Sequence, residues 1–219
     1  MVTPEPPRWS PADLADAVHQ GLQERAQADD LEQAVYSLDA LDELGLHPLL
    51  TDALDAAGYG VHREQRYPGH AHKRKKSHGL RCDLVLTPRH APLQDPRAAA
   101  TLFEDPRACP IDHACWVEVK TVAQYETSGA FRRYSAELLQ TVSKDIRKLW
   151  SDGVIRHAAL LIVLFSASQR VAEHDLLAWQ DRCLRKGMPV SMPALRGFAL
   201  NNRLGNAWCA TAVFTVRGM

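Results

Sequence analysis

The 219-residue sequence lacks an apolar run long enough to cross a bilayer. Its longest run, AALLIVLF at Ala158–Phe165, is far shorter than the roughly 20 residues that a membrane-spanning helix needs. The acidic, proline-rich stretch MVTPEPPRWSPADLADAV contains no basic segment followed by an apolar one, so a secretory signal is not recognised. We therefore expect a cytoplasmic protein that has no membrane partner.

Several other signatures are missing from the chain. Five cysteines, an odd number, do not indicate a disulfide framework, and we expect small buried thiols instead. Neither a Gly-x-Ser-x-Gly elbow nor a Gly-x-x-x-x-Gly-Lys phosphate loop is present. These absences disfavour serine hydrolases of the elbow type and P-loop nucleotide hydrolases.

Basic residues are scarce at the start of the chain and concentrated further on. Residues 1–58 contain two basic and twelve acidic residues, a net charge of −10, so the remainder carries +10 within a neutral total. The segment His62–Arg81 alone holds seven Lys or Arg residues, four His residues and one Glu. Such a basic zone is compatible with a polyanionic partner.

The apolar periodicity predicts an α/β protein. A first helix is expected from Ser10-Pro11, and a second helical stretch from Leu31 to Leu54 that Pro48 kinks or divides and Gly58 ends. Further along, alternation or continuous apolar runs predict strands and a helical period predicts helices. The expected strands are 59–68, 80–86, 115–122 and 157–165, the expected helices are 134–150 and 169–187, a short helix is expected at 96–103, and a β-hairpin is expected over 196–216.

Two of these strands carry charged residues that an apolar strand does not need. Asp83 lies in LRCDLVL, and Glu118 and Lys120 lie in CWVEVK, where a spacing of two places both side chains on one face. If the two strands pair, Asp83 and Glu118 converge, and a divalent cation would offset their repulsion. Mg²⁺ is commonly held by one or two carboxylates, with Mn²⁺ as the alternative here. If such a metal site hydrolyses a phosphate ester, Lys120 would have one of two roles. It would either neutralise the negative charge of the phosphate or, with a depressed pKa, help to deprotonate the water that attacks it.

The segments GLRCDLVLTP and CWVEVK resemble the two metal-binding segments of the PD-(D/E)XK nuclease superfamily, which is restriction-endonuclease-like. The resemblance implies an αβββαβ core with a mixed sheet over about residues 31–165, inside a single domain of residues 31–219, after an arm and helix at 1–30. It implies that Asp83, Glu118 and Lys120 are catalytic, and that the two acids bind metal. The cysteine before Asp83 and the long proline-rich segment 87–114 depart from the family pattern.

Some members of this superfamily add a Glu from the first core helix and a Gln from the helix after the lysine. Glu43 and Gln140 match these places, so the resemblance implies a metal-binding and catalytic role for Glu43. Glu64 is a rival for the extra acidic ligand, and a solvated helix acid is the alternative for Glu43. For Asp83, Glu118 and Lys120 the alternative is a structural ion pair on a strand face.

Phosphate contacts are expected from basic side chains near these motifs. The predicted nucleic-acid-binding residues are Lys73, Arg74, Lys75 and Lys76 in the turn, with Gln140 and Lys144 on the later helix. A solvated turn is the alternative interpretation for HKRKKSH, because charge runs commonly are solvated.

The combined hypothesis is a Mg²⁺-dependent nuclease that hydrolyses phosphodiester bonds of nucleic acid, with DNA the expected substrate and RNA left open. An endonuclease that cuts both strands needs two sites, so a homodimer or a partner protein is expected. The alternative is a nuclease-like fold without turnover that binds nucleic acid or serves in an assembly.

Overall fold

The computed structural model describes residues 9–70, 80–95 and 105–217. Its centre is a six-stranded mixed sheet with strand order β1-β2-β3-β6-β8-β7. The strands β3 and β6 are parallel, and the other neighbouring pairs are antiparallel. The strand bounds are β1 Tyr59–Arg66, β2 Arg81–Pro88, β3 Cys115–Ala123, β6 His157–Ser166, β7 Ala194–Ala199 and β8 Trp208–Arg217.

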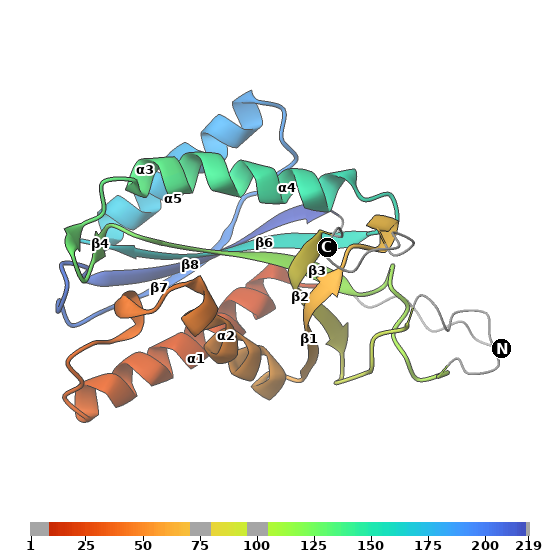
Figure 1. Ribbon diagram of the computed structural model, residues 1–219, viewed down its shortest axis with the longest axis horizontal. Helices are drawn as coiled ribbons and strands as arrows, with labels where there is room; N and C mark the ends of the chain where they lie inside the picture. Colours follow the sequence, from red (N-terminus) through yellow and green to blue (C-terminus); the bar gives the residue numbers. More distant parts are fainter. Residues whose placement is uncertain (1–8, 71–79, 96–104, 218–219) are drawn as a thin grey trace.

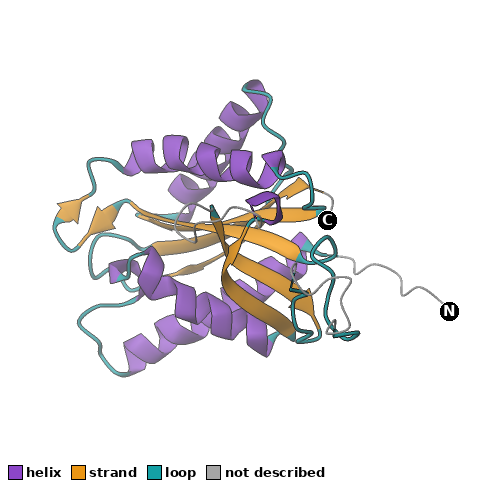
Figure 2. Ribbon diagram, turned by 45° about the vertical axis from the view of Figure 1, so that its right-hand side comes forward, coloured by secondary structure: helices purple, strands orange, loops and turns teal. Residues whose placement is uncertain are grey.

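Helices cover both faces of this sheet (Figures 1 and 2). The helices α1 (Pro11–Leu31) and α2 (Glu43–Ala56) lie on one face. The opposite face carries α3 (Tyr134–Ala136), the π-helical turn η4 (Glu137–Thr141), α4 (Val142–Ser151) and α5 (Gln169–Arg185). Short 3-10 turns, η1 (Leu38–Ala40) and η2 (Pro68–His70), and the small hairpin β4 (Tyr125–Glu126) and β5 (Gly129–Ala130) complete the described elements.

The alternation of side chains on the central strands divides the core into two layers. On β6, Ala158, Leu160, Ile162 and Leu164 pack toward the α4 and α5 side, and the intervening apolar residues pack toward α1 and α2. The uniform apolar run of β6 follows from burial on both faces. None of the helices within the described ranges is long and apolar enough to span a membrane.

Most predicted elements are confirmed, and the sequence locates several ends correctly. The Ser10 hydroxyl accepts the Asp13 N–H at 3.1 Å with Pro11 in the first turn, and Gly58 follows α2 with a φ of +93° that favours glycine. All five cysteines are free and buried. The helix predicted at 96–103 lies outside the described residues.

The helical stretch predicted from Leu31 to Leu54 is wrong in its first part, before α2 begins. Leu31 ends α1 and is 85% exposed, and Val35 follows it with 78% exposure. The Ser37 hydroxyl instead donates to the buried Asp29 carboxylate at 2.9 Å, a side-chain contact that holds the connection in a non-helical path. Asp42 then caps Gly45 N–H at 2.8 Å, so α2 begins at Glu43.

Pro48 does not divide this helix. It lies inside α2, which runs without interruption from Glu43 to Ala56. Glu43 lies in the first turn of this helix. Its Oε2 accepts hydrogen bonds from the Lys120 ammonium at 2.8 Å and from the Thr121 N–H at 3.4 Å, so its side chain faces β3.

The packing of α1 on α2 depends on a glycine. The two helices are in close contact at Gly21, because a Cβ added there would overlap the Cβ of Ala53. We predict that Gly21→Ala lowers the free energy of unfolding by about 1–3 kcal/mol in urea titrations, because overpacking outweighs the helix propensity of alanine. Gly153→Ala, where an added Cβ meets nothing within 4 Å, is the control. A Gly21→Ala protein as stable as the unmodified chain would contradict this packing.

Candidate active site

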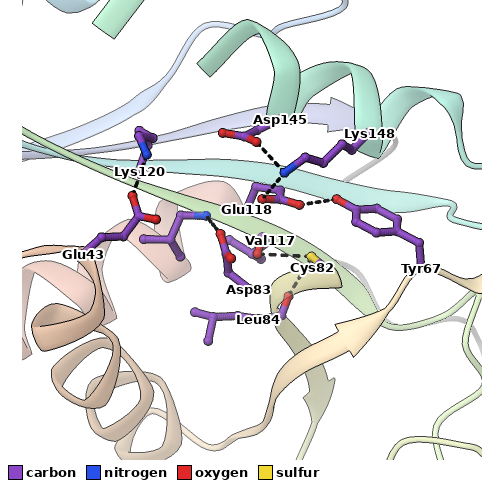
Figure 3. Close-up of polar contacts among 11 residues, drawn as sticks. Glu43, Tyr67, Cys82, Asp83, Leu84, Val117, Glu118, Lys120, Asp145 and Lys148 are labelled. Atoms are coloured by element: carbon purple, nitrogen blue, oxygen red, sulfur yellow. Dashed lines mark hydrogen bonds and ion pairs between the residues drawn. The ribbon is translucent and has the colours of Figure 1, made fainter. Parts of the chain in front are cut away.

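The site forms where β2 separates from β3. These strands pair only over Leu84–Leu86 and Cys115–Val117, whereas β3 continues to pair with β6 as far as Ala123. At the first unpaired position, the Asp83 Oδ2 accepts the Val119 N–H at 2.8 Å (Figure 3). A carboxylate therefore satisfies a backbone donor that lies beyond the end of the β2–β3 ladder. Beyond this point, no described strand pairs with the β2-facing edge of β3.

Asp83 and Glu118 are brought together as the sequence predicts. Glu118 is 2% exposed, and burial, aided by the charge of Asp83, raises its pKa to about 8. Burial also raises the pKa of Asp83, although hydrogen bonds from the Val119 N–H and with Glu118 oppose the shift. Two adjacent carboxyl groups with raised pKa values indicate a site where negative charge lacks sufficient compensation.

Lys120 makes an ion pair with Glu43 rather than with the two motif acids. Its Nζ lies 2.8 Å from the Glu43 Oε2, and the lysine side chain is 16% exposed. Burial alone would lower the pKa of Lys120. The hydrogen bond to Glu43 and the nearby acidic charges raise it by more, so the pKa is above the usual value. The lysine in this structure is therefore a cation, and the depressed pKa that a neutral base requires is absent.

The predicted acids do not all converge on one point. Within the described ranges, no group of three or more His, Cys, Asp or Glu side chains is arranged to hold a metal ion. Glu43 influences Asp83 only by raising its pKa through its charge. Glu64, the rival acid, is exposed and lies at an irregularity of β1 with a φ of +53°. The structure thus places Glu43, and not Glu64, beside Lys120.

Three further side chains contact Glu118 or its partners, and sequence analysis did not assign them to the site. The Tyr67 hydroxyl donates to the Glu118 Oε1 at 2.5 Å, and the Lys148 Nζ lies 3.5 Å from the Oε2. Lys148 also pairs with Asp145 at 2.7 Å (Figure 3). The three-residue spacing of Asp145 and Lys148 on an amphipathic helix was an available signal, whereas nothing local marks Tyr67.

His47 is a second group that sequence analysis missed. It follows Glu43 by one helical turn and is 2% exposed, and neither ring nitrogen has a hydrogen-bond partner in the part of the chain that the structure describes. Its proximity to Asp83 lowers the pKa of that carboxyl. Since burying an unpaired polar group costs about 1–3 kcal/mol, His47 marks an incomplete polar site. The four-residue spacing in ELGLH was the available signal.

An open pocket of about 380 Å³ lies beside Lys120. Its lining comprises η1 and the start of α2, the end of β3, and the β4–β5 region. Among the described residues that line it, the basic one is Lys120, and the acidic ones are Asp39, Asp42, Glu43, Glu126 and Glu137, the last of which pairs with Arg133 at 3.7 Å. A polyanion entering this pocket would meet excess negative charge unless cations accompany it.

The predicted nucleic-acid-binding residues are only partly described. Lys144 is exposed on α4. Gln140 lies in η4, but its side chain is outside the described part of the structure, as are Lys73, Arg74, Lys75 and Lys76 in full. Their contacts with nucleic acid therefore stay predictions.

The raised pKa of Glu118 predicts a pH dependence of stability. Between about pH 4.5 and 8 the folded state retains a proton at Glu118 that the unfolded chain has lost, so the free energy of unfolding falls as the pH rises. In chelator-treated protein, we expect Glu118→Gln to remove this slope, which is at most about 1.4 kcal/mol per pH unit. Urea titrations across this range measure it, with Glu173→Gln on α5 as the control. An unchanged slope in Glu118→Gln would contradict the assignment.

Comparisons of the chain with protein-family models, with curated proteins and with solved structures find no match. Any assignment of function therefore depends on the chain's own residues and on the geometry described above.

Proposed function

We propose that this protein is a metal-dependent nuclease that hydrolyses phosphodiester bonds, with DNA as its principal substrate. One observation carries the proposal. The Asp83 and Glu118 carboxyl groups are adjacent where β2 separates from β3, and Lys120 follows Glu118 by two residues on β3. The order of α2, three antiparallel strands, α4 and the parallel strand β6 supports a PD-(D/E)XK nuclease core.

The residues at this site fit a divalent cation. Asp83 and Glu118 are acidic and adjacent, Glu118 is buried and Asp83 is partly buried, and the nearby His47 imidazole has no hydrogen-bond partner among the described residues. Asp83 and Glu118 would hold Mg²⁺ or Mn²⁺, and waters and substrate oxygens commonly complete such a shell, so a third protein carboxylate is not required. Within the described ranges, neither Glu43, which is paired with Lys120, nor His47 is arranged with them as a third ligand. When bound, such a cation supplies positive charge to phosphoryl oxygens and lowers the pKa of water.

Lys120 is the group that would contact the reacting phosphate. Its ammonium is charged, partly buried and held by Glu43, so its charge can stabilise the negative charge that builds up on phosphoryl oxygens. A partly buried charge acts more strongly than one in water, because the surrounding medium is less polarisable. The elevated pKa supports this electrostatic role over removal of a proton from water.

The acidic lining of the adjacent pocket supports dependence on cations. With several carboxylates against Lys120, this pocket would repel a phosphate backbone in the absence of metal. Binding of the remaining backbone is assigned to the basic residues Lys73–Lys76 and to Lys144, through contacts that do not read sequence. Cleavage of both strands of a duplex would use two copies of the chain or a partner protein, because the described residues form one such site.

A cleavage assay tests this function. Single-stranded DNA, double-stranded DNA and RNA are incubated with the protein in Mg²⁺, Mn²⁺ or EDTA. We expect metal-dependent products that fall about 100-fold or more in Asp83→Asn and in Lys120→Met, because each variant removes charge from the site. Asp181→Asn and Lys186→Met, which make the same changes in and after α5, are the matched controls.

The outcomes separate the nuclease from its alternative. Salt-sensitive binding to all three nucleic acids without products under any metal condition would favour a nuclease-like binding or assembly module. Products that persist in EDTA or in Asp83→Asn would contradict the site proposed here. Absence of both binding and cleavage would contradict the nucleic-acid partner itself.

A further inference from the structure

Glu118 is fixed by a residue outside the two motif strands. The Tyr67 hydroxyl donates to its Oε1 at 2.5 Å, and both residues are only 2% exposed. In a contact between a tyrosine hydroxyl and a carboxylate oxygen the hydroxyl is the donor, so this hydrogen bond fixes the position of Oε1. The contact joins residues that are 51 positions apart in the chain.

Tyr67 is itself held in place by several independent contacts. Its ring stacks on Trp116 with centroids 5.8 Å apart, and its N–H donates to the Leu80 carbonyl at 3.2 Å. Two residues later, the Gly69 N–H donates to the Asp152 Oδ2 at 2.8 Å. A ring fixed in this way directs its hydroxyl to one place, and that place is the Glu118 carboxyl (Figure 3).

The second oxygen of Glu118 faces the Lys148–Asp145 pair on α4. Lys148 lies 3.5 Å from the Oε2 and is held by Asp145 at 2.7 Å. Asp83 lies across from Glu118 just beyond the Leu84–Val117 end of the β2–β3 ladder, and its Oδ2 accepts the N–H of Val119, the residue after Glu118, at 2.8 Å. Glu118 is therefore held from the segment after β1 and from α4, and it neighbours Asp83 of β2.

We propose that Tyr67 is a positioning residue that orients the Glu118 carboxylate for a divalent cation shared with Asp83. This inference rests on the proposed function. Hydrogen bonds from outer residues commonly fix the orientation of metal-binding side chains, and their loss typically reduces metal affinity about 10–100-fold. Tyr67 acts through Glu118, so the effect is on cation binding before it is on chemistry.

Tyr67→Phe tests the inference, because it removes the hydroxyl and retains the ring that stacks on Trp116. Mn²⁺ binding to the full chain is measured by electron paramagnetic resonance and by calorimetry, without nucleic acid. We expect a Kd for Mn²⁺ that is about 10–100-fold weaker in Tyr67→Phe, with an unchanged far-ultraviolet circular dichroism spectrum.

The matched control is Tyr134→Phe. Tyr134 also donates its hydroxyl to a carboxylate, Asp175, at 2.6 Å, but that pair does not involve Glu118. We expect Mn²⁺ binding in this variant to equal that of the unmodified protein. Melting temperatures of both variants show how far the loss of a tyrosine–carboxylate hydrogen bond affects the fold.

Each outcome decides a particular point. Unaltered Mn²⁺ affinity in Tyr67→Phe would overturn the positioning role while leaving the proposed nuclease intact. Equal loss of affinity in both tyrosine variants would also overturn it, because the effect would then be general destabilisation. If the unmodified protein, Asp83→Asn and Glu118→Gln all bind Mn²⁺ equally weakly, the cation site and the proposed function both fail.

Discussion

The hydrogen bond from the Val119 N–H to the Asp83 carboxylate is the contact on which the candidate site depends. The β2–β3 ladder ends at Leu84 and Val117, and an edge strand that leaves its neighbour exposes unsatisfied backbone groups. Asp83 supplies an acceptor at that point, so β2 can diverge from β3 without leaving this donor unpaired. The divergence opens the edge of β3 from Glu118 onward, and it is on this stretch that the charged residues of the strand lie.

The same divergence explains why charged residues occur in an otherwise apolar strand. Trp116 and Val122 pack on the α4 side of the sheet, and Glu118 and Lys120 occupy the two positions between them on that face. Burial of Glu118 would carry a large free-energy cost without partners. Tyr67 and Lys148 reduce that cost, but its raised pKa shows that the compensation is incomplete. A site left in this electrostatic state favours the binding of positive charge.

Local patterns predicted the strands and the shared face, because those properties depend on side-chain periodicity. The alternation in CWVEVK placed Glu118 and Lys120 on one face, and the continuous apolar run placed β6 in the centre of the sheet. The connection after Leu31 was not predictable in this way, because the Ser37 hydroxyl bonds to Asp29 and overrides an apolar helical period. The role of Tyr67 was not predictable from local patterns, because its contact with Glu118 forms only when the segments on either side of β2 fold together.

The sequence left two roles open for Lys120: a cation that stabilises negative charge, or a neutral base that removes a proton from water. The ion pair with Glu43 favours the first role. A lysine that removes a proton near neutral pH needs a pKa well below its usual value, which burial alone would promote. Burial lowers the pKa of Lys120, but Glu43, together with the charges of Asp145 and Glu137, raises it above the usual value, so the ammonium form is favoured. The described lining of the pocket beside it is rich in carboxylates, so Lys120 lies next to several negative charges. In the proposed reaction, a charged Lys120 would stabilise an anionic phosphoryl group most effectively once other cations have offset the neighbouring acids. The proposed role of the lysine is therefore coupled to cation binding by the acids of β2 and β3.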